Sequence, residues 1–148
     1  MNYYYYKNAT LPKVVATSFS DDVDSISFDL KPVYIVPSLL SLTRTNTYTR
    51  TPGIESVVIQ DKVKFSTLTS YEFAIPSRNG IWTELSSSSN ILTGKFTVGT
   101  ISLNVRVRST NAFRSSAIIK TLNEVTYTRL GISMINPIIE DIITVTFN

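Results

Sequence analysis

The side chains that could carry chemistry in this sequence are mainly carboxylates, because it contains no histidine and no cysteine. Asp21, Asp22 and Asp24 fall close together, with Asp29 nearby, and such a group offers the oxygen ligands that Ca²⁺ and Mg²⁺ prefer. The run lacks the glycine and the distal glutamate of an EF-hand loop. Asp-rich stretches are also ordinary turns, since these side chains bond to their own backbone. We therefore predict a solvated turn and no metal.

Groups suited to catalysis are few. Without histidine and cysteine the chain has no Ser-His-Asp or Cys-His arrangement and lacks the usual zinc and haem ligands. The GxxxxGK[ST] phosphate loop does not occur. What remains are Ser–Lys pairs and carboxylate pairs such as Glu72 with Glu84, and opposed acids on an exposed hairpin more often serve solubility than catalysis. The sequence predicts no enzymatic activity and no cofactor.

Arginines form the other candidate group. Arg106 and Arg108 alternate with aliphatic residues, and we predict that Arg114 and Arg129 lie close to them, giving a patch for an anionic partner. The net charge is +3, yet no run of five or six like charges marks a nucleic-acid-binding tail. A solvated sheet face, or ion pairs with a neighbouring subunit, also explains the four arginines. Nucleic acid is thus an allowed partner but not the favoured one.

The elements that position these residues are predicted to be strands. Hydrophobic residues make up 43% of the 148 positions, and 19 Ser and 19 Thr accompany many Val, Ile, Tyr and Phe residues, a composition that favours pleated sheets. Strict alternation of apolar and polar residues over 25–30, 101–108 and 143–147 indicates half-buried strands. Less regular strands are predicted over residues 14–19, 33–36, 42–50, 57–65, 71–75, 81–85, 95–98 and 124–129.

Turns and one helix complete the predicted fold. The Asn79-Gly80 pair favours a tight hairpin joining 71–75 to 81–85. Asn111 can cap a short helix over 111–122, whose apolar residues share one side. With no linker or repeat, the chain is predicted to be a single antiparallel β domain over 1–148, a sandwich or barrel, jelly-roll-like in the commonest case. A smaller twisted sheet carrying the 111–122 helix is the alternative.

Two segments are candidates for contacts with other proteins. Residues 1–7 can form a docking arm of aromatic rings, although a first strand packed in its own domain explains the tyrosines equally well. Residues 43–56 are polar on both faces, which indicates a projecting hairpin or loop. The predicted assembly interface therefore consists of Tyr3, Tyr4, Tyr5, Tyr6, Tyr48 and Arg50.

Targeting signals are not evident. The first twenty residues lack the basic and apolar regions of a secretory signal. The longest apolar stretch, 132–143, is interrupted by polar residues and is shorter than the ~20 residues of a membrane-spanning helix. We expect no secretion by a signal peptide and no membrane span.

In general character the chain resembles the small all-β structural proteins of phages and other viruses, such as capsid, penton, decoration, head-to-tail and tail components. The resemblance lies in composition and strand pattern over the whole chain, so it assigns no site residue. It implies a non-enzymatic virion subunit, assembled in the host cytoplasm, whose partners are copies of itself in a homo-oligomer and other virion structural proteins. The alternatives are a β-rich module that binds carbohydrate through Trp82, or single-stranded nucleic acid through the arginines, and an exported cell-surface or filament subunit.

Overall fold

The alternating pattern of the sequence is realised as long antiparallel strands. The computed structural model describes residues 10–148, so the predicted arm at 1–7, with Tyr3, Tyr4, Tyr5 and Tyr6, lies outside the described residues. The described part contains one short 3-10 helix, η1 (Lys31–Val33), and eleven strands. In chain order these are β1 (Lys13–Phe19), β2 (Val23–Asp29), β3 (Leu39–Thr49), β4 (Ser56–Thr69), β5 (Glu72–Arg78), β6 (Ile81–Ser87), β7 (Ile91–Val98), β8 (Ile101–Ser109), β9 (Phe113–Leu122), β10 (Val125–Met134) and β11 (Ile138–Phe147).

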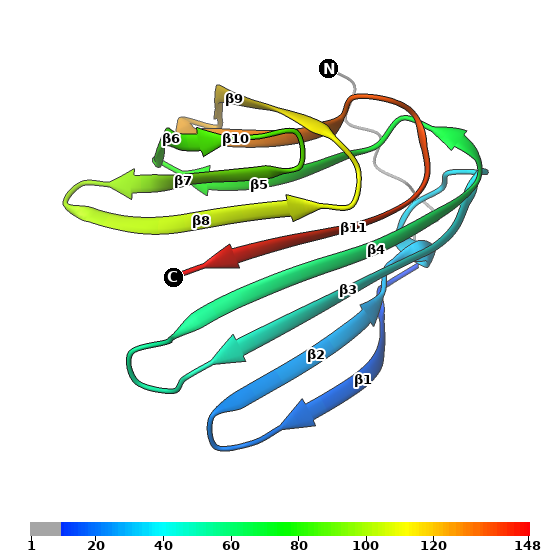
Figure 1. Ribbon diagram of the computed structural model, residues 1–148, viewed down its shortest axis with the longest axis horizontal. Helices are drawn as coiled ribbons and strands as arrows, with labels where there is room; N and C mark the ends of the chain where they lie inside the picture. The colour runs from blue at the N-terminus through cyan, green and yellow to red at the C-terminus, as the bar shows by residue number, and fades with distance from the viewer. Residues whose placement is uncertain (1–9) are drawn as a thin grey trace.

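The strands form two antiparallel sheets (Figure 1). The larger sheet has eight strands in the order β1-β2-β3-β4-β11-β8-β7-β6, and the smaller has three in the order β5-β10-β9. The all-β prediction is confirmed, as a sandwich and not as a closed barrel, because β1 and β6 end the larger sheet without pairing with each other. The larger sheet consists of two meanders, β1–β4 and β6–β8, joined through β11, rather than the paired Greek keys of a jelly roll.

The core lies between the smaller sheet and part of the larger one. Its main cluster joins apolar residues of β5, β9 and β10 to those of β7, β8 and β11. A second cluster, Leu39, Leu42, Val63, Phe65 and Ile138, lies where β3, β4 and β11 adjoin. Buried and exposed residues alternate along these strands, because successive side chains of a strand point to opposite faces.

The helix predicted over 111–122 is wrong, because this segment forms β9. It pairs with β10 along its whole length. Asn123 and Glu124 in the connection both have positive φ, 48° and 65°, which is the backbone of a type I′ hairpin turn. Pairing with β10 therefore outweighs the helical spacing of a few apolar residues.

A buried carboxylate holds the chain where it passes from β8 to β9. Asp141, 2% exposed, accepts hydrogen bonds from the hydroxyls of Ser109 (2.8 Å) and Thr110 (2.6 Å). Asn111, the predicted helix cap, donates its side-chain amide to the same carboxylate at 2.9 Å. This connection leads the chain from the larger sheet to the smaller one, where a continuous helix was expected.

The pairing predicted from the Asn79-Gly80 turn is also wrong. β5 pairs with β10 and β6 pairs with β7, so the segments on either side of the turn lie in different sheets. Asn79 has the expected positive φ of 55°, but its backbone N–H donates to the Thr126 carbonyl at 2.9 Å. The Thr128 hydroxyl donates to the Gly80 carbonyl. The turn is therefore a corner between the sheets.

Three further observations complete the fold. The strand predicted at 33–36 is wrong, because these residues include the end of η1 and the coil after it. The segment 43–56, expected to project, comprises most of β3, the connection to β4 and the first residue of β4. β2 and β11 flank this pair, so its strands lie inside the sheet. Among residues 10–148 the helical structure is limited to the three residues of η1, and none of it could span a bilayer.

Candidate functional site

The inner face of β1, β2 and β3 is the feature that most resembles a binding surface. The inner face is the side of the larger sheet that packs on the smaller sheet. Figure 1 shows β1, β2 and β3 extending beyond the smaller sheet, and neither core cluster includes a residue of β1 or β2. We call this surface the uncovered face; its apolar residues are Val14, Phe19, Ile26, Phe28 and Tyr48.

The uncovered face exposes much apolar area for a soluble domain. Val14, Phe19 and Tyr48 are 52%, 67% and 40% exposed. Cross-strand register places Val14 opposite Phe28, and Phe28 opposite Arg44, whose side chain points inward. Contiguous exposed apolar patches of this kind mark interaction sites more often than inert surface.

An open concavity of about 670 Å³ continues this face toward β8 and β11. Its apolar lining includes Val57, Leu103 and Phe147. Tyr48 and Arg50, both predicted as interface residues, also line it. Arg50 is held in place, because its guanidinium bonds to the Asp24 carboxylate and to the Ser20 carbonyl. The structure thus brings two of the predicted interface residues to one surface.

One polar atom on this face has no partner. The side-chain oxygen of Asn46 is buried without a hydrogen bond among the described residues. Asn46 stands between Ile26 of β2 and Ile59 of β4. Buried polar atoms without partners are uncommon in native domains, and this one is an unused hydrogen-bond acceptor beside the uncovered face.

Beside the uncovered face lies an ion pair whose carboxylate is buried. Arg44 of β3 and Asp61 of β4 are directly opposed in the sheet, and two parallel hydrogen bonds of 2.7 Å join them. The Asp61 carboxylate raises the pKa of Arg44, and partial burial of the guanidinium opposes this effect. The guanidinium carbon also lies 5.3 Å from the ring centre of Phe73 in β5. The pair therefore ties the two sheets together at the edge of the core.

A cavity of about 560 Å³ opens at this pair. Its size is within the range of small-molecule pockets, about 300–1,000 Å³, and Leu42, Val63 and Phe65 make part of its wall apolar. Tyr71 lines it as well, and burial raises the pKa of its hydroxyl. The cavity can hold an apolar group, but its charged arginine and protonated tyrosine do not form a nucleophile with a base.

Arg44 and Asp61 were not identified from the sequence. Each occupies a position of an alternating strand that faces the apolar side. In the sequence Arg44 lies between two threonines, and Asp61 lies midway between Ile59 and Val63. A charged residue in such a position is expected to have a partner when it is buried. The sequence therefore contained an indication that both residues are paired, but only the pairing of β3 with β4 identified each as the partner of the other.

The four predicted patch arginines divide between two surfaces. Arg106 and Arg108 lie together on the outer face of β8, since Val105 and Val107 fill the inner face. Arg114 and Arg129 lie on the smaller sheet, in β9 and β10. Arg129 forms an ion pair with Glu72, while Arg114 is exposed.

The acidic candidates are also separated. Glu72 accepts a hydrogen bond from Ser133 (2.6 Å) and pairs with Arg129, and these two contacts hold its pKa below the usual range. Glu84, on another sheet, accepts from Ser87 at 2.7 Å. Among residues 10–148 no three Asp or Glu side chains are grouped as metal ligands.

Trp82, the residue considered for stacking on sugars, packs into the sandwich. Its ring lies at 5.0 Å and 54° from that of Phe96, and it covers Gly94, where a side chain would collide with the indole. This placement makes Trp82 a packing residue of β6.

Comparisons with known proteins concern the fold. The sequence matches no protein-family model and no curated protein. Among solved structures it is similar to a heparinase III, with a TM-score of 0.59 at 15% identity. A second structure, the heparinase III with methylated lysines, gives a TM-score of 0.60 at 12% identity. The match covers 92% of this chain and 21% of that chain in both cases. The chain thus spans about a fifth of those proteins and shares with that part of them an antiparallel β fold.

Proposed function

We propose that this chain is a non-enzymatic structural subunit that works by contacts with copies of itself, as the subunits of viral particles do. The observation that carries the proposal is the uncovered face. The larger sheet has eight strands and the smaller only three, so within residues 10–148 the apolar residues of β1, β2 and β3 have no covering layer. A second copy supplies such a layer without any reactive side chain.

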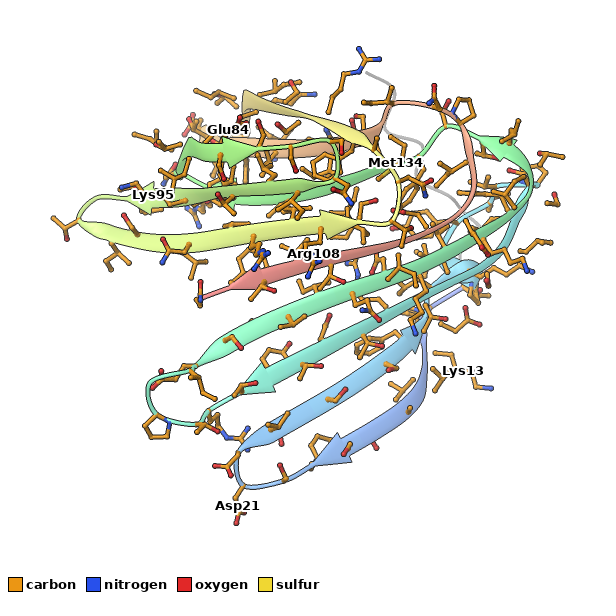
Figure 2. The ribbon with its side chains drawn as sticks, in the orientation of Figure 1. Lys13, Asp21, Glu84, Lys95, Arg108 and Met134 are labelled. Carbon is orange, nitrogen blue, oxygen red and sulfur yellow. The ribbon has the colours of Figure 1, made fainter. Side chains whose placement is uncertain are left out.

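The charge pattern of β1 favours a two-fold arrangement of two copies. Lys13 begins this edge strand, and Asp21 and Asp22 follow its other end. Figure 2 shows Lys13 and Asp21 at opposite ends of β1. If two β1 strands run antiparallel across a two-fold axis, Lys13 of each copy meets Asp21 and Asp22 of the other.

The proposal is tested by the mass of the full chain in solution, measured by light scattering or mass photometry over a range of concentrations. We expect dimers or larger assemblies that dissociate on dilution. Val14→Ser with Phe19→Ser should shift this equilibrium at least tenfold toward the monomer. A matched control is Ile81→Ser with Ile119→Ser, which removes two apolar residues of similar exposure from β6 and β9 and should leave assembly unchanged.

Charge reversal distinguishes the two-fold arrangement from unspecific association. Lys13→Glu alone should weaken assembly, because like charges then face each other. Adding Asp21→Lys and Asp22→Lys should restore it. A monomer at every concentration, or equal loss in the test and control pairs, contradicts the proposal.

A further inference from the structure

Five cationic side chains share the outer face of the larger sheet, opposite the uncovered face and the core. Lys62 and Lys64 flank buried Val63 in β4. Arg106 and Arg108 flank buried Val107 in β8. In β7, Lys95 stands between buried Gly94 and Phe96, and Figure 2 labels it together with Arg108. We call these five residues the cationic row.

Strand register arranges them in a line that crosses the sheet diagonally. The first four cations lie opposite every second residue of β11, in the pairs Lys64↔Glu140, Lys62↔Ile142, Arg108↔Thr144 and Arg106↔Thr146. Lys95 continues this step, because it lies opposite Asn104, which is two residues from Arg106 in β8. Two residues of a strand span about 7 Å, and neighbouring strands are about 5 Å apart. The row therefore has steps of roughly 7–12 Å and a length of about 30 Å.

The row is not neutralised by the protein itself. The ion pairs of residues 10–148 join Arg44 to Asp61, Arg50 to Asp24 and Arg129 to Glu72, so none uses a cation of the row. Two acids share the outer face at the β4 end: Glu140 stands opposite Lys64, and Asp29 of β2 lies level with Lys62, two strands away across Thr43. Unpaired cations in a line raise the local concentration of an anion and favour a linear partner over a compact one.

The surroundings of the row suit a polar chain. Thr144 and Thr146 of β11 and Thr93 of β7 share the outer face with the cations. At the β4 end, Lys62 and Lys64 border a concavity of about 360 Å³ that Thr110, Glu140 and Asp141 also line. Hydroxyls and cations together can bind both the hydroxyls and the acid groups of a sugar polymer.

The same face is poorly suited to single-stranded nucleic acid. Proteins of that class place exposed aromatic rings beside the basic groove, so that bases stack on them. The outward residues of β4, β11, β8 and β7 include no aromatic side chain within the described ranges of those strands. Nucleic acid could therefore be held only through its phosphates.

We propose that the cationic row binds an extended acidic polysaccharide through its sulfate or carboxylate groups. The contact uses the outer face, so it goes beyond the proposed self-assembly and does not depend on it. The chain of sugars lies along the diagonal, with its acid groups against Lys64, Lys62, Arg108, Arg106 and Lys95 in that order.

The test is titration of the full chain with a size-defined heparin oligosaccharide, over a series of salt concentrations, by calorimetry or fluorescence anisotropy. We expect saturable binding with a steep negative dependence of log affinity on log salt. Arg106→Thr with Arg108→Thr should weaken binding about tenfold and reduce the salt slope by about two units, because two ionic contacts are lost. Threonine preserves the strand preference of these positions.

The matched control is Arg78→Thr with Arg114→Thr, which removes the same charge from the smaller sheet and should leave the affinity within about twofold, because screening weakens distant surface charges. Equal losses in the two variants would show attraction by net charge alone and overturn the proposal. So would an absence of binding at low salt, or tighter binding of a thymidine 30-mer than of the oligosaccharide. An uncharged dextran of similar length should not bind. Thermal melting confirms that each variant is folded.

Discussion

Arg44 and Asp61 face each other across β3 and β4, and their bidentate contact leaves the arginine side chain 33% exposed but the carboxylate only 3% exposed. This asymmetry separates the pair from ordinary surface salt bridges. The carboxylate depends on the arginine for neutralisation, whereas the arginine still reaches solvent. It also places a charge at the point where the uncovered face meets the core.

The first prediction follows from this asymmetry. Arg44→Met should lower the free energy of unfolding by about 3–5 kcal/mol, because it leaves a buried charge without a partner. Asp61→Asn should lower the free energy of unfolding by distinctly less, since Arg44 keeps part of its hydration. Urea unfolding of both variants at pH 7 measures the difference. Equal costs would mean that Asp61 is better hydrated than its burial indicates.

The second prediction concerns acid stability. Ser133 and Arg129 lower the pKa of Glu72 from its ordinary value of 4.5, so the unfolded chain takes up a proton at higher pH than the folded chain does. The stabilisation by Glu72 is therefore complete above about pH 4.5 and is lost as the pH falls through the lower, folded pKa.

Glu72→Gln should reduce the pH dependence of the thermal unfolding midpoint between about pH 5 and pH 3. The effect should remain below about 1 kcal/mol, because the pair is exposed to solvent. Ser133→Ala should reduce the same pH dependence by a smaller amount. Thermal melts across this range test both variants, and an unchanged pH profile in Glu72→Gln would remove Glu72 as its source.

The third prediction tests the packing of Trp82. A methyl group at Gly94 would collide with the indole ring and lie 2.6 Å from the Thr83 carbonyl oxygen. Gly94→Ala should therefore destabilise the fold by roughly 1–3 kcal/mol, as overpacking does. It should also change the tryptophan fluorescence. If the melting temperature and the emission are both unchanged, Trp82 does not rest on this glycine.

The fourth prediction tests whether 113–122 is a strand. Glu124 has a φ of 65° in the turn between β9 and β10, where glycine is preferred. Glu124→Gly should raise stability by about 0.5–1 kcal/mol, because it relieves strain at a positive φ. Lys120→Gly, within β9, should instead lower it. Equal destabilisation by both variants would argue against the turn.

The sequence by itself determined the class of structure. Alternation at 101–108 gave the correct strand and the correct faces of Arg106 and Arg108, because the two-residue period of a strand is a local property. The positive φ of Asn79 was likewise foreseeable from the Asn-Gly pair. Composition alone was sufficient to indicate a domain made almost entirely of strands.

Only the tertiary structure decided which strands meet. Asp61 lies opposite Arg44 and Lys62 joins a row with Arg108 because β4, β11 and β8 are neighbours, and these residues are far apart in the chain. The uncovered face exists because the smaller sheet has too few strands to cover the larger one. Pairing of this kind depends on how the whole chain buries its apolar area, so no local pattern could specify it.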